Sequence, residues 1–81
     1  MVRYEKETRR SPDEVMERAL KFFGPQGLGM TVEEQGDCCL YFSGGGGYVQ
    51  VQLARAEKNR TLVTVESREW DYQALRFLEK V

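Results

Sequence analysis

The sequence predicts an α+β fold, in which an antiparallel sheet carries two helices on one face. Two observations predict it. Residues 11–24 and 70–81 carry apolar side chains at the spacing of amphipathic helices, whereas residues 2–9 and most of residues 30–70 alternate apolar with polar side chains, as strands do. The expected order is therefore β-α-β-β-β-β-α. With 81 residues, we expect one domain that spans residues 1–81.

The first helix has the clearest local signals. Ser11 can cap its N-terminus, Pro12 suits the first helical position, and Glu14 completes a capping box. Gly24, followed by Pro25, is expected to end the helix. Between these ends, the apolar stripe consists of Val15, Met16, Ala19, Leu20, Phe22 and Phe23.

Three turns divide residues 30–70 into four strands. The first turn is expected at residues 34–36, because a three-residue loop needs a left-handed last position and Gly36 supplies it. The second closes over the four glycines of residues 44–47, and the third turns at residues 57–59 with Asn59 in the left-handed region. The expected pairs are Val32–Cys38 and Met30–Leu40 across the first turn, Ser43–Tyr48, Phe42–Val49, Leu40–Val51 and Cys38–Leu53 across the second, and Leu53–Val63 and Val51–Val65 across the third.

Residues 70–81 predict the closing helix. Asp71 is a suitable cap. The apolar stripe consists of Ala74, Leu75, Leu78 and Val81, with Phe77 at its edge. We expect both helices to cover the sheet face that carries Leu40, Val51 and Val65.

The run of four glycines raises the question of a phosphate-binding loop. Such a loop leads from a strand into a helix N-terminus, and a lysine and a hydroxyl usually follow its glycines. Here a strand leads to a strand, and Tyr48 follows the last glycine. We therefore interpret residues 44–47 as a hairpin turn rather than a phosphate site.

Cys38 and Cys39 are adjacent, so they cannot join distant parts of the fold. Alternation along a strand predicts Cys38 in the core and Cys39 on the helix-free face. We expect two reduced thiols, because the protein is expected in the cytosol, where thiols stay reduced. A disulfide between the neighbours is the alternative, and it would strain the peptide between them. The chain has no histidine and no other cysteine, so we expect no metal site and no cofactor.

The charged residues favour a non-enzymatic protein. A formal net charge of −1 gives no general attraction to nucleic acid or to an anionic membrane. The carboxylates fall near loops or at outward strand positions, so we expect no pair that converges for acid–base catalysis. The chain has no apolar run of membrane-spanning length and no apolar stretch near its start, which predicts a cytoplasmic protein.

The motif RRSPDEVMERA after the first strand, the four-strand meander and the closing helix together resemble a reduced START-like (helix-grip) domain. The same order of elements is similar to the half-domain of the TATA-binding-protein-like fold. The resemblance spans the whole chain and implies the fold alone. START-like domains usually carry further strands and a long final helix around a deep ligand cavity, which this length does not provide. The meander is not basic, so the DNA-binding role of TATA-binding proteins is not implied.

The helix-free face of the sheet is the candidate binding surface. Its uncharged residues are Thr31, Cys39, Tyr41, Tyr48, Gln50, Gln52, Ala54, Leu62 and Thr64. Tyrosine, glutamine and small apolar residues with a rim of charged residues (Glu33, Asp37, Glu66 and Arg68) are typical of a protein interface. We therefore expect a module that forms a homodimer, or binds another protein, through this face.

Two alternatives remain open. In the first, the face is simply half exposed to solvent, and its residues are present because they favour strand formation. A small apolar ligand is the other alternative, in a pocket between the first helix, the glycine hairpin and Tyr48. That pocket requires room among Phe22, Phe23, Phe42 and Trp70.

Overall fold

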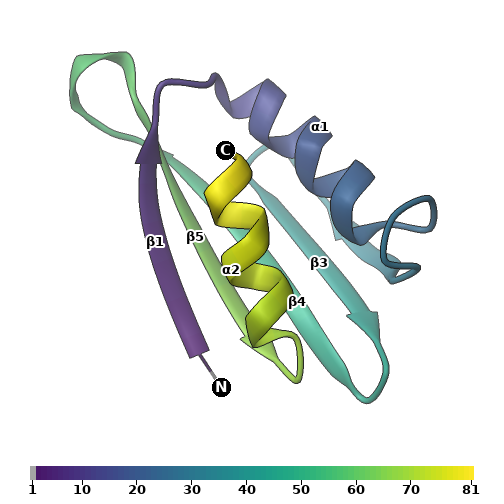
Figure 1. Ribbon diagram of the computed structural model, residues 1–81. Coiled ribbons are helices and arrows are strands. Elements are labelled where there is room, and N and C mark those ends of the chain that lie inside the picture. The colour runs from purple at the N-terminus through teal and green to yellow at the C-terminus, as the bar shows by residue number, and fades with distance from the viewer. Residues whose placement is uncertain (1) are drawn as a thin grey trace.

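The helices and strands follow one another in the predicted order. The computed structural model describes residues 2–81 and contains one five-stranded antiparallel sheet with two helices on one face (Figure 1). The elements are β1 (Val2–Thr8), α1 (Pro12–Phe23), β2 (Thr31–Gln35), β3 (Cys39–Gly44), β4 (Gly47–Arg55), β5 (Thr61–Arg68) and α2 (Asp71–Lys80). A short 3₁₀ turn, η1 (Glu57–Asn59), connects β4 to β5.

The strand order across the sheet is β1-β5-β4-β3-β2. The first strand of the chain therefore pairs with the last one, and β2 and β1 form the two edges. α1 packs against β3 and β4, while α2 packs against β5 and β1. Figure 1 shows both helices on the same side of the sheet, so the opposite side carries no helix.

α1 begins and ends at the predicted residues, but the expected capping box is only half formed, because the Glu14 carboxylate accepts a hydrogen bond from Arg10 instead. The Ser11 hydroxyl accepts a hydrogen bond from the Glu14 backbone N–H at 3.2 Å, and Pro12 occupies the first helical position. The helix ends where the Gly24 N–H donates to the Leu20 carbonyl oxygen. The predicted stripe faces the sheet, with Val15, Ala19 and Phe23 buried and Met16, Leu20 and Phe22 packed against the core.

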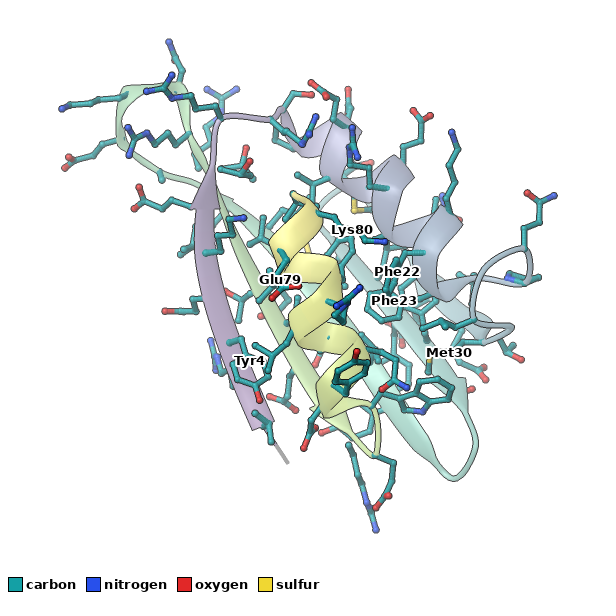
Figure 2. The ribbon with its side chains drawn as sticks, in the orientation of Figure 1. Tyr4, Phe22, Phe23, Met30, Glu79 and Lys80 are labelled. Atoms are coloured by element: carbon teal, nitrogen blue, oxygen red, sulfur yellow. A yellow bond between two sulfur atoms is a disulfide. The ribbon has the colours of Figure 1, made fainter. Side chains whose placement is uncertain are left out.

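Three phenyl rings form the centre of the core between the helices and the sheet. The ring centroid of Phe23 lies 5.3 Å from that of Phe42 and 5.2 Å from that of Phe77. All three side chains are almost completely buried. Figure 2 shows Phe22 and Phe23 in the space between α1 and α2. The rings join elements from the beginning, the middle and the end of the chain.

The central hairpins have the predicted registers. Ser43 pairs with Tyr48, Phe42 with Val49, and Leu40 with Val51 across the second turn. Leu53 pairs with Val63 and Val51 with Val65 across the third. Asn59 adopts the predicted left-handed conformation, and Lys58 shares it. Paired residues share a face, so apolar side chains from β3, β4 and β5 form continuous rows beneath the helices.

The glycine run forms the predicted turn, with two glycines at its tip. Gly44 pairs with Gly47, so Gly45 and Gly46 alone form the loop, at φ values of 56° and 79°. Positive φ at both central residues is the requirement of a type I′ turn, which glycine satisfies without steric cost. The turn's twist matches that of the strands it joins.

The predicted register between β2 and β3 is wrong. Val32 pairs with Phe42 rather than with Cys38, and Gln35 pairs with Leu40. An irregularity between Val32 and Glu34 takes up the extra residue, as a β-bulge does. The turn lies later than predicted, since the Gly36 N–H donates to the Cys39 carbonyl oxygen at 2.9 Å. The three polar residues at positions 33–35 give no alternation that could fix the register.

Two details predicted for α2 are also wrong. The helix starts one residue earlier than predicted, with Trp70 at the capping position, and the Asp71 carboxylate instead accepts a hydrogen bond from the Ser67 hydroxyl at 2.6 Å. Phe77 is buried, whereas Leu75 is 43% exposed. Ala74 and Leu78 face the core whether Leu75 or Phe77 is the third buried residue. The larger ring of Phe77 takes this position, against Phe22 and Phe23.

We predict that Gly47→Ala destabilises the protein although residue 47 lies outside the loop tip. A methyl group at this position would overlap the backbone carbonyl of Arg68 on the neighbouring strand. Forcing β4 and β5 apart is expected to lower the free energy of unfolding by about 1–3 kcal/mol, measured by urea denaturation. Gly36→Ala is the matched control, because its nearest heavy atom lies 3.9 Å away. It is expected to change stability by less than about 0.5 kcal/mol, and equal losses in the two variants would contradict the strand spacing described here.

Candidate functional site

The helix-free face presents the alternate residues of the central strands. Leu40 and Val51 are almost completely buried beneath the helices, at 1% and 0% exposure. Their neighbours Tyr41 and Gln50 pair with each other and point to the opposite face. The predicted division between the two faces is therefore confirmed for β3 and β4.

The sheet brings the predicted residues of this face into adjacent rows. Gln52 pairs with both Cys39 and Thr64, and Tyr48 and Thr31 both pair with Ser43. The exposed members are Thr31, Gln52 and Ala54, and the half-buried members are Cys39, Tyr41, Tyr48, Gln50 and Leu62. Thr64 differs from the others, because it is only 7% exposed and its hydroxyl lies 3.5 Å from a carboxylate oxygen of Glu5. It can contribute little contact area to a partner.

Two stacked tyrosines lie on neighbouring strands of the helix-free face, toward the glycine hairpin. The rings of Tyr41 and Tyr48 are nearly parallel, at 9°, with centroids 5.5 Å apart. The Tyr48 hydroxyl donates to a carboxylate oxygen of Glu66 at 2.7 Å. This hydrogen bond, which only the protonated phenol can donate, is the main reason that the pKa of Tyr48 is raised above its ordinary value of 10.0. The stacked pair is therefore held in a defined orientation.

Charge on the helix-free face is confined to its two sides. β3 and β4 contribute only uncharged residues there, from Cys39 to Ser43 and from Tyr48 to Ala54. On the β2 side lie Glu33, whose carboxylate accepts from Ser43, and Glu34, which pairs with Tyr41. On the other side, β5 and β1 contribute Glu66, Arg68, Arg3, Glu5 and Glu7. The β2 flank of the uncharged stripe is therefore acidic, whereas the β5–β1 flank is mixed, with three glutamates and two arginines. Of these glutamates, Glu7 is paired with Arg60.

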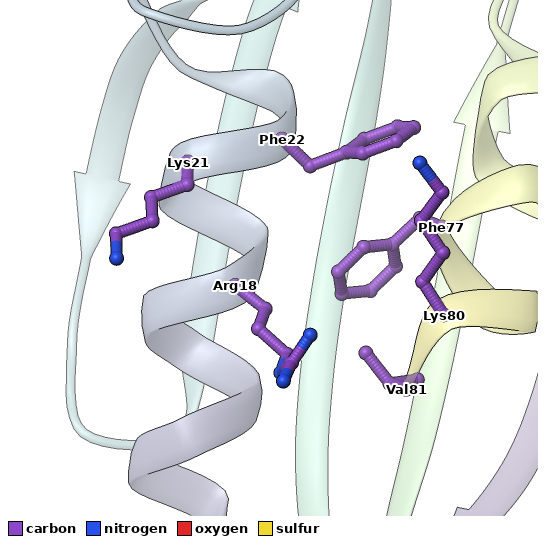
Figure 3. A pocket seen from close by; sticks show the side chains of 6 residues that line it. All are labelled: Arg18, Lys21, Phe22, Phe77, Lys80 and Val81. Atoms are coloured by element: carbon purple, nitrogen blue, oxygen red, sulfur yellow. The ribbon is translucent and has the colours of Figure 1, made fainter.

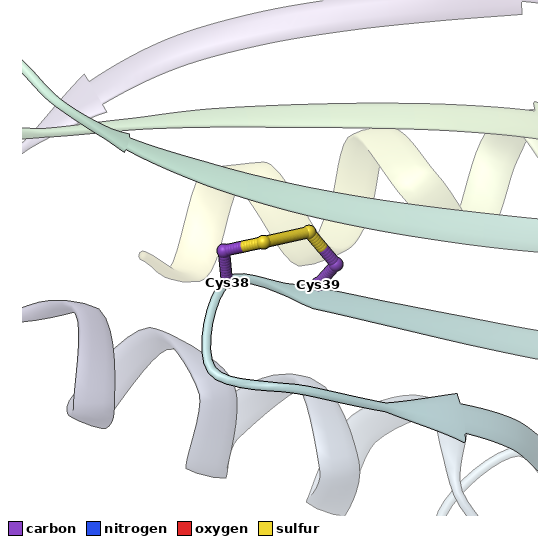
Figure 4. The surroundings of a disulfide bond; sticks show 2 residues. All are labelled: Cys38 and Cys39. Carbon is purple, nitrogen blue, oxygen red and sulfur yellow. A yellow bond between two sulfur atoms is a disulfide. The ribbon is translucent and has the colours of Figure 1, made fainter.

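The neighbouring cysteines depart from the prediction. Cys38 and Cys39 form a disulfide bond with each other at the turn between β2 and β3 (Figure 4). The prediction of two reduced thiols is therefore wrong, and so is the prediction that Cys38 is buried, since it is exposed. β3 begins only at Cys39, so the alternation of a strand does not separate the two side chains.

The place predicted for a ligand pocket is filled by side chains. Trp70 covers the glycine hairpin, and its indole N–H donates to the Gly44 carbonyl oxygen at 2.9 Å. A methyl group added at Gly44 would contact both Met30 and Trp70. Tyr48 lies on the opposite face of the sheet from α1. These residues therefore do not enclose a common space next to the first helix.

A different groove lies between the two helices. It has a volume of about 280 Å³ and is lined by Arg18, Lys21, Phe22, Phe77, Lys80 and Val81. Figure 3 shows Arg18 and Lys80 reaching into the space between the helices, while Lys21 points away from α2. Lys21 is engaged by Glu17 at 3.0 Å, and the Lys80 ammonium lies 5.3 Å from the ring centroid of Phe22. The groove thus combines an apolar floor with two cations at its rim.

The sequence did not predict this groove, although part of its signal was visible. Arg18 and Phe22 are four residues apart, which places a cation and a ring on neighbouring turns of one helix face. Phe77 and Lys80 have the same relation on α2, at a spacing of three residues. The angle and distance between the two helices decide whether these faces meet, and no local pattern determines them.

Other clusters of chemically active groups are few. Within residues 2–81, no three histidine, cysteine, aspartate or glutamate side chains are grouped so that they could hold a metal ion. Two arginines near the β1–α1 connection form ion pairs, Arg10 with Glu14 at 3.3 Å and Arg60 with Glu7 at 3.7 Å.

Of the two helices described within residues 2–81, neither is long and apolar enough to cross a membrane.

Comparison of the chain with known protein families, curated proteins and solved structures found no match. The resemblance to START-like and TATA-binding-protein-like domains therefore stays a prediction.

We predict that the pKa of Tyr48 lies above its ordinary value of 10.0 and that Glu66→Gln lowers it. The amide removes the negative charge and the strong acceptor that hold the phenol in its protonated form. The measurement is the pH dependence of the ring chemical shifts in protein labelled with ¹³C-tyrosine. The contribution of this contact to stability should be complete below pH 10.0 and be lost as the pH rises through the raised pKa of Tyr48. Glu69→Gln serves as the control, and an equal change in that variant would contradict the assignment to Glu66.

Proposed function

We propose that this protein is a small protein-binding module, and that a partner docks an amphipathic helix on the helix-free face of its sheet. The observation that supports this most is the uncharged stripe on β3 and β4 between two charged flanks, of which the one at β2 is acidic. The stripe carries the stacked rings of Tyr41 and of Tyr48, which lies at its glycine-hairpin end. Rigid aromatic side chains on a surface with a charged rim are characteristic of protein interfaces.

The dimensions of the stripe suit one helix. Two adjacent strands span about 10 Å, which is the diameter of a helix with its side chains. From Tyr48 to Ala54 the stripe extends for six strand positions, about 20 Å, which corresponds to about 14 helical residues. An interface of this size falls at the low end for specific complexes, so we expect a weak and transient one.

Charge favours a different protein over a second copy of this chain. Face-to-face packing of two copies would bring Glu33 and Glu34 of one copy against either the same residues or the mixed β5–β1 flank of the other, and neither has an excess of positive charge. Like charges that meet in an interface oppose association. A partner helix with an apolar stripe, and with lysine or arginine on the side that meets β2, would complement the acidic flank. For this reason we favour a different protein over a homodimer.

The prediction is that a synthetic peptide of about 14 residues, with leucine and tryptophan on one face and lysine along the flank that meets β2, binds to β3 and β4. Backbone amide shifts of ¹⁵N-labelled protein report the site. Tyr41→Glu should weaken binding by about tenfold or more, because it places a charge in the centre of the stripe. Arg76→Glu on the exposed side of α2 is the matched control and should bind as the parent does.

Three outcomes would contradict this proposal. The first is an equal affinity for a peptide with glutamate in place of lysine. The second is a set of shifts that maps to α1 and α2. The third is a concentration-dependent dimer in sedimentation equilibrium that Tyr41→Glu abolishes, which would support self-association through the same face instead.

Small-ligand binding is a second candidate, and the groove between the helices is the observation that favours it. Its volume of about 280 Å³ lies just below the usual range of ligand pockets, so the ligand would be small. Phe22 and Phe77 supply an apolar floor, and Arg18 and Lys80 supply positive charge. A short organic carboxylate with an apolar tail combines the two complementary properties.

For this second candidate, we predict that octanoate shifts the amide signals of α1 and α2, whereas octanol and acetate shift them much less. Arg18→Gln and Lys80→Gln should each weaken octanoate binding about threefold to tenfold, since these cations are partly exposed to solvent. Arg76→Gln is the control, because Arg76 lies on the exposed side of α2 and does not line the groove. Equal binding of octanol and octanoate would contradict the role of the two cations.

A further inference from the structure

The disulfide between Cys38 and Cys39 is unusual in joining neighbours in the sequence. A disulfide stabilises a fold mainly by closing a loop of the unfolded chain, and its effect grows with the length of that loop. This bond encloses no intervening residue. It therefore restricts the unfolded chain very little and cannot serve the fold as a cross-link.

The turn at this position is also held without the disulfide. The Gly36 N–H donates to the Cys39 carbonyl oxygen at 2.9 Å, and the Leu53 N–H donates to the Cys38 carbonyl oxygen at 2.8 Å. These backbone hydrogen bonds connect the turn to itself and to β4. Cleavage of the sulfur–sulfur bond would leave both of them in place.

The bond is accessible to reagents in solution. Cys38 is exposed, as are Gly36 and Asp37 before it, whereas Cys39 is half-buried on the helix-free face. Exposed disulfides are the ones that exchange with thiols, since a thiolate must reach one sulfur to attack it. Access therefore favours attack at Sγ of Cys38, with Cys39 as the leaving thiolate.

We propose that Cys38 and Cys39 form a thiol–disulfide exchange site whose reaction partner is a dithiol. One thiolate of the dithiol attacks Sγ of Cys38, and the bond to Sγ of Cys39 breaks, leaving the electron pair on Cys39. The second thiolate of the dithiol then attacks the sulfur of the mixed disulfide that belongs to the dithiol, and Cys38 leaves as a thiolate. The dithiol is oxidised to a disulfide, and the protein is reduced by two electrons and takes up two protons.

The exchange also changes the helix-free face. Cys39 lies on this face and pairs with Gln52, beside the stripe that carries the stacked tyrosines. Once the bond is cut, its side chain is no longer tied to the exposed Cys38 and can present a thiol on the face. Any effect on a partner rests on the function proposed above, whereas the exchange itself does not.

The test treats the folded, oxidised protein with a small excess of dithiothreitol and then alkylates it with N-ethylmaleimide. We expect mass spectrometry to find two alkylated thiols per chain, while the melting temperature falls by less than about 4 °C. Amide shifts should change near residues 36–41 and at Gln52 and not in the helices. These readouts need no partner, so they succeed or fail independently of peptide binding to the sheet face.

Single variants identify the sulfur that is attacked. The Cys39→Ser variant retains the exposed thiol and should form a mixed disulfide with oxidised glutathione. The Cys38→Ser variant retains the half-buried thiol and should react about tenfold more slowly. Thiols that appear only under unfolding conditions would overturn the proposal, as would unfolding upon reduction or equal rates in the two variants.

Discussion

The period of two along β3, β4 and β5 is the constraint on which the rest of this structure depends. Leu40, Val51 and Val65 form one row beneath the helices, and Tyr41, Gln50 and Glu66 form the adjacent row on the other face. A slip of one residue between strands would exchange the two faces. The type I′ turn at Gly45 and Gly46 prevents this slip, so the same hairpin tip sets both the core and the candidate binding surface.

The parts of the fold that the sequence predicts are those with a strong apolar alternation. The predicted registers of the β3–β4 and β4–β5 hairpins are correct, because nearly every slip would bury a polar side chain or expose an apolar one. The predicted β2–β3 register is wrong, because residues 33–35 are all polar. A bulge among them therefore exposes no apolar side chain. The stripe of α2 has two acceptable phases, and only the position of the aromatic rings of α1 decides between them. The disulfide was missed because Cys38 lies before the strand that was expected to contain it.

The candidate site was predictable in its centre and not at its edges. Alternation within β3 and β4 is enough to place Tyr41, Tyr48 and Gln50 together. The charged flank on the far side, which mixes glutamates with arginines, depends on β1 pairing with β5, which joins residues far apart in the chain. The groove between the helices likewise depends on how two helices lie relative to each other. In both cases the deciding information is long-range, and local spacing does not contain it.

The position of β1 has a consequence for how the chain acquires its structure. Thr8 finds its partner in Thr61, and Val2 finds its partner in Ser67. At a synthesis rate of about 5–20 residues per second, β1 leaves the ribosome several seconds before β5, the strand with which it pairs. The alternating charged residues of this segment, Arg3, Glu5, Glu7 and Arg9, keep it hydrated and discourage aberrant pairing during that interval. We therefore expect the pairing of β1 with β5 to be the last in the sheet to form during synthesis.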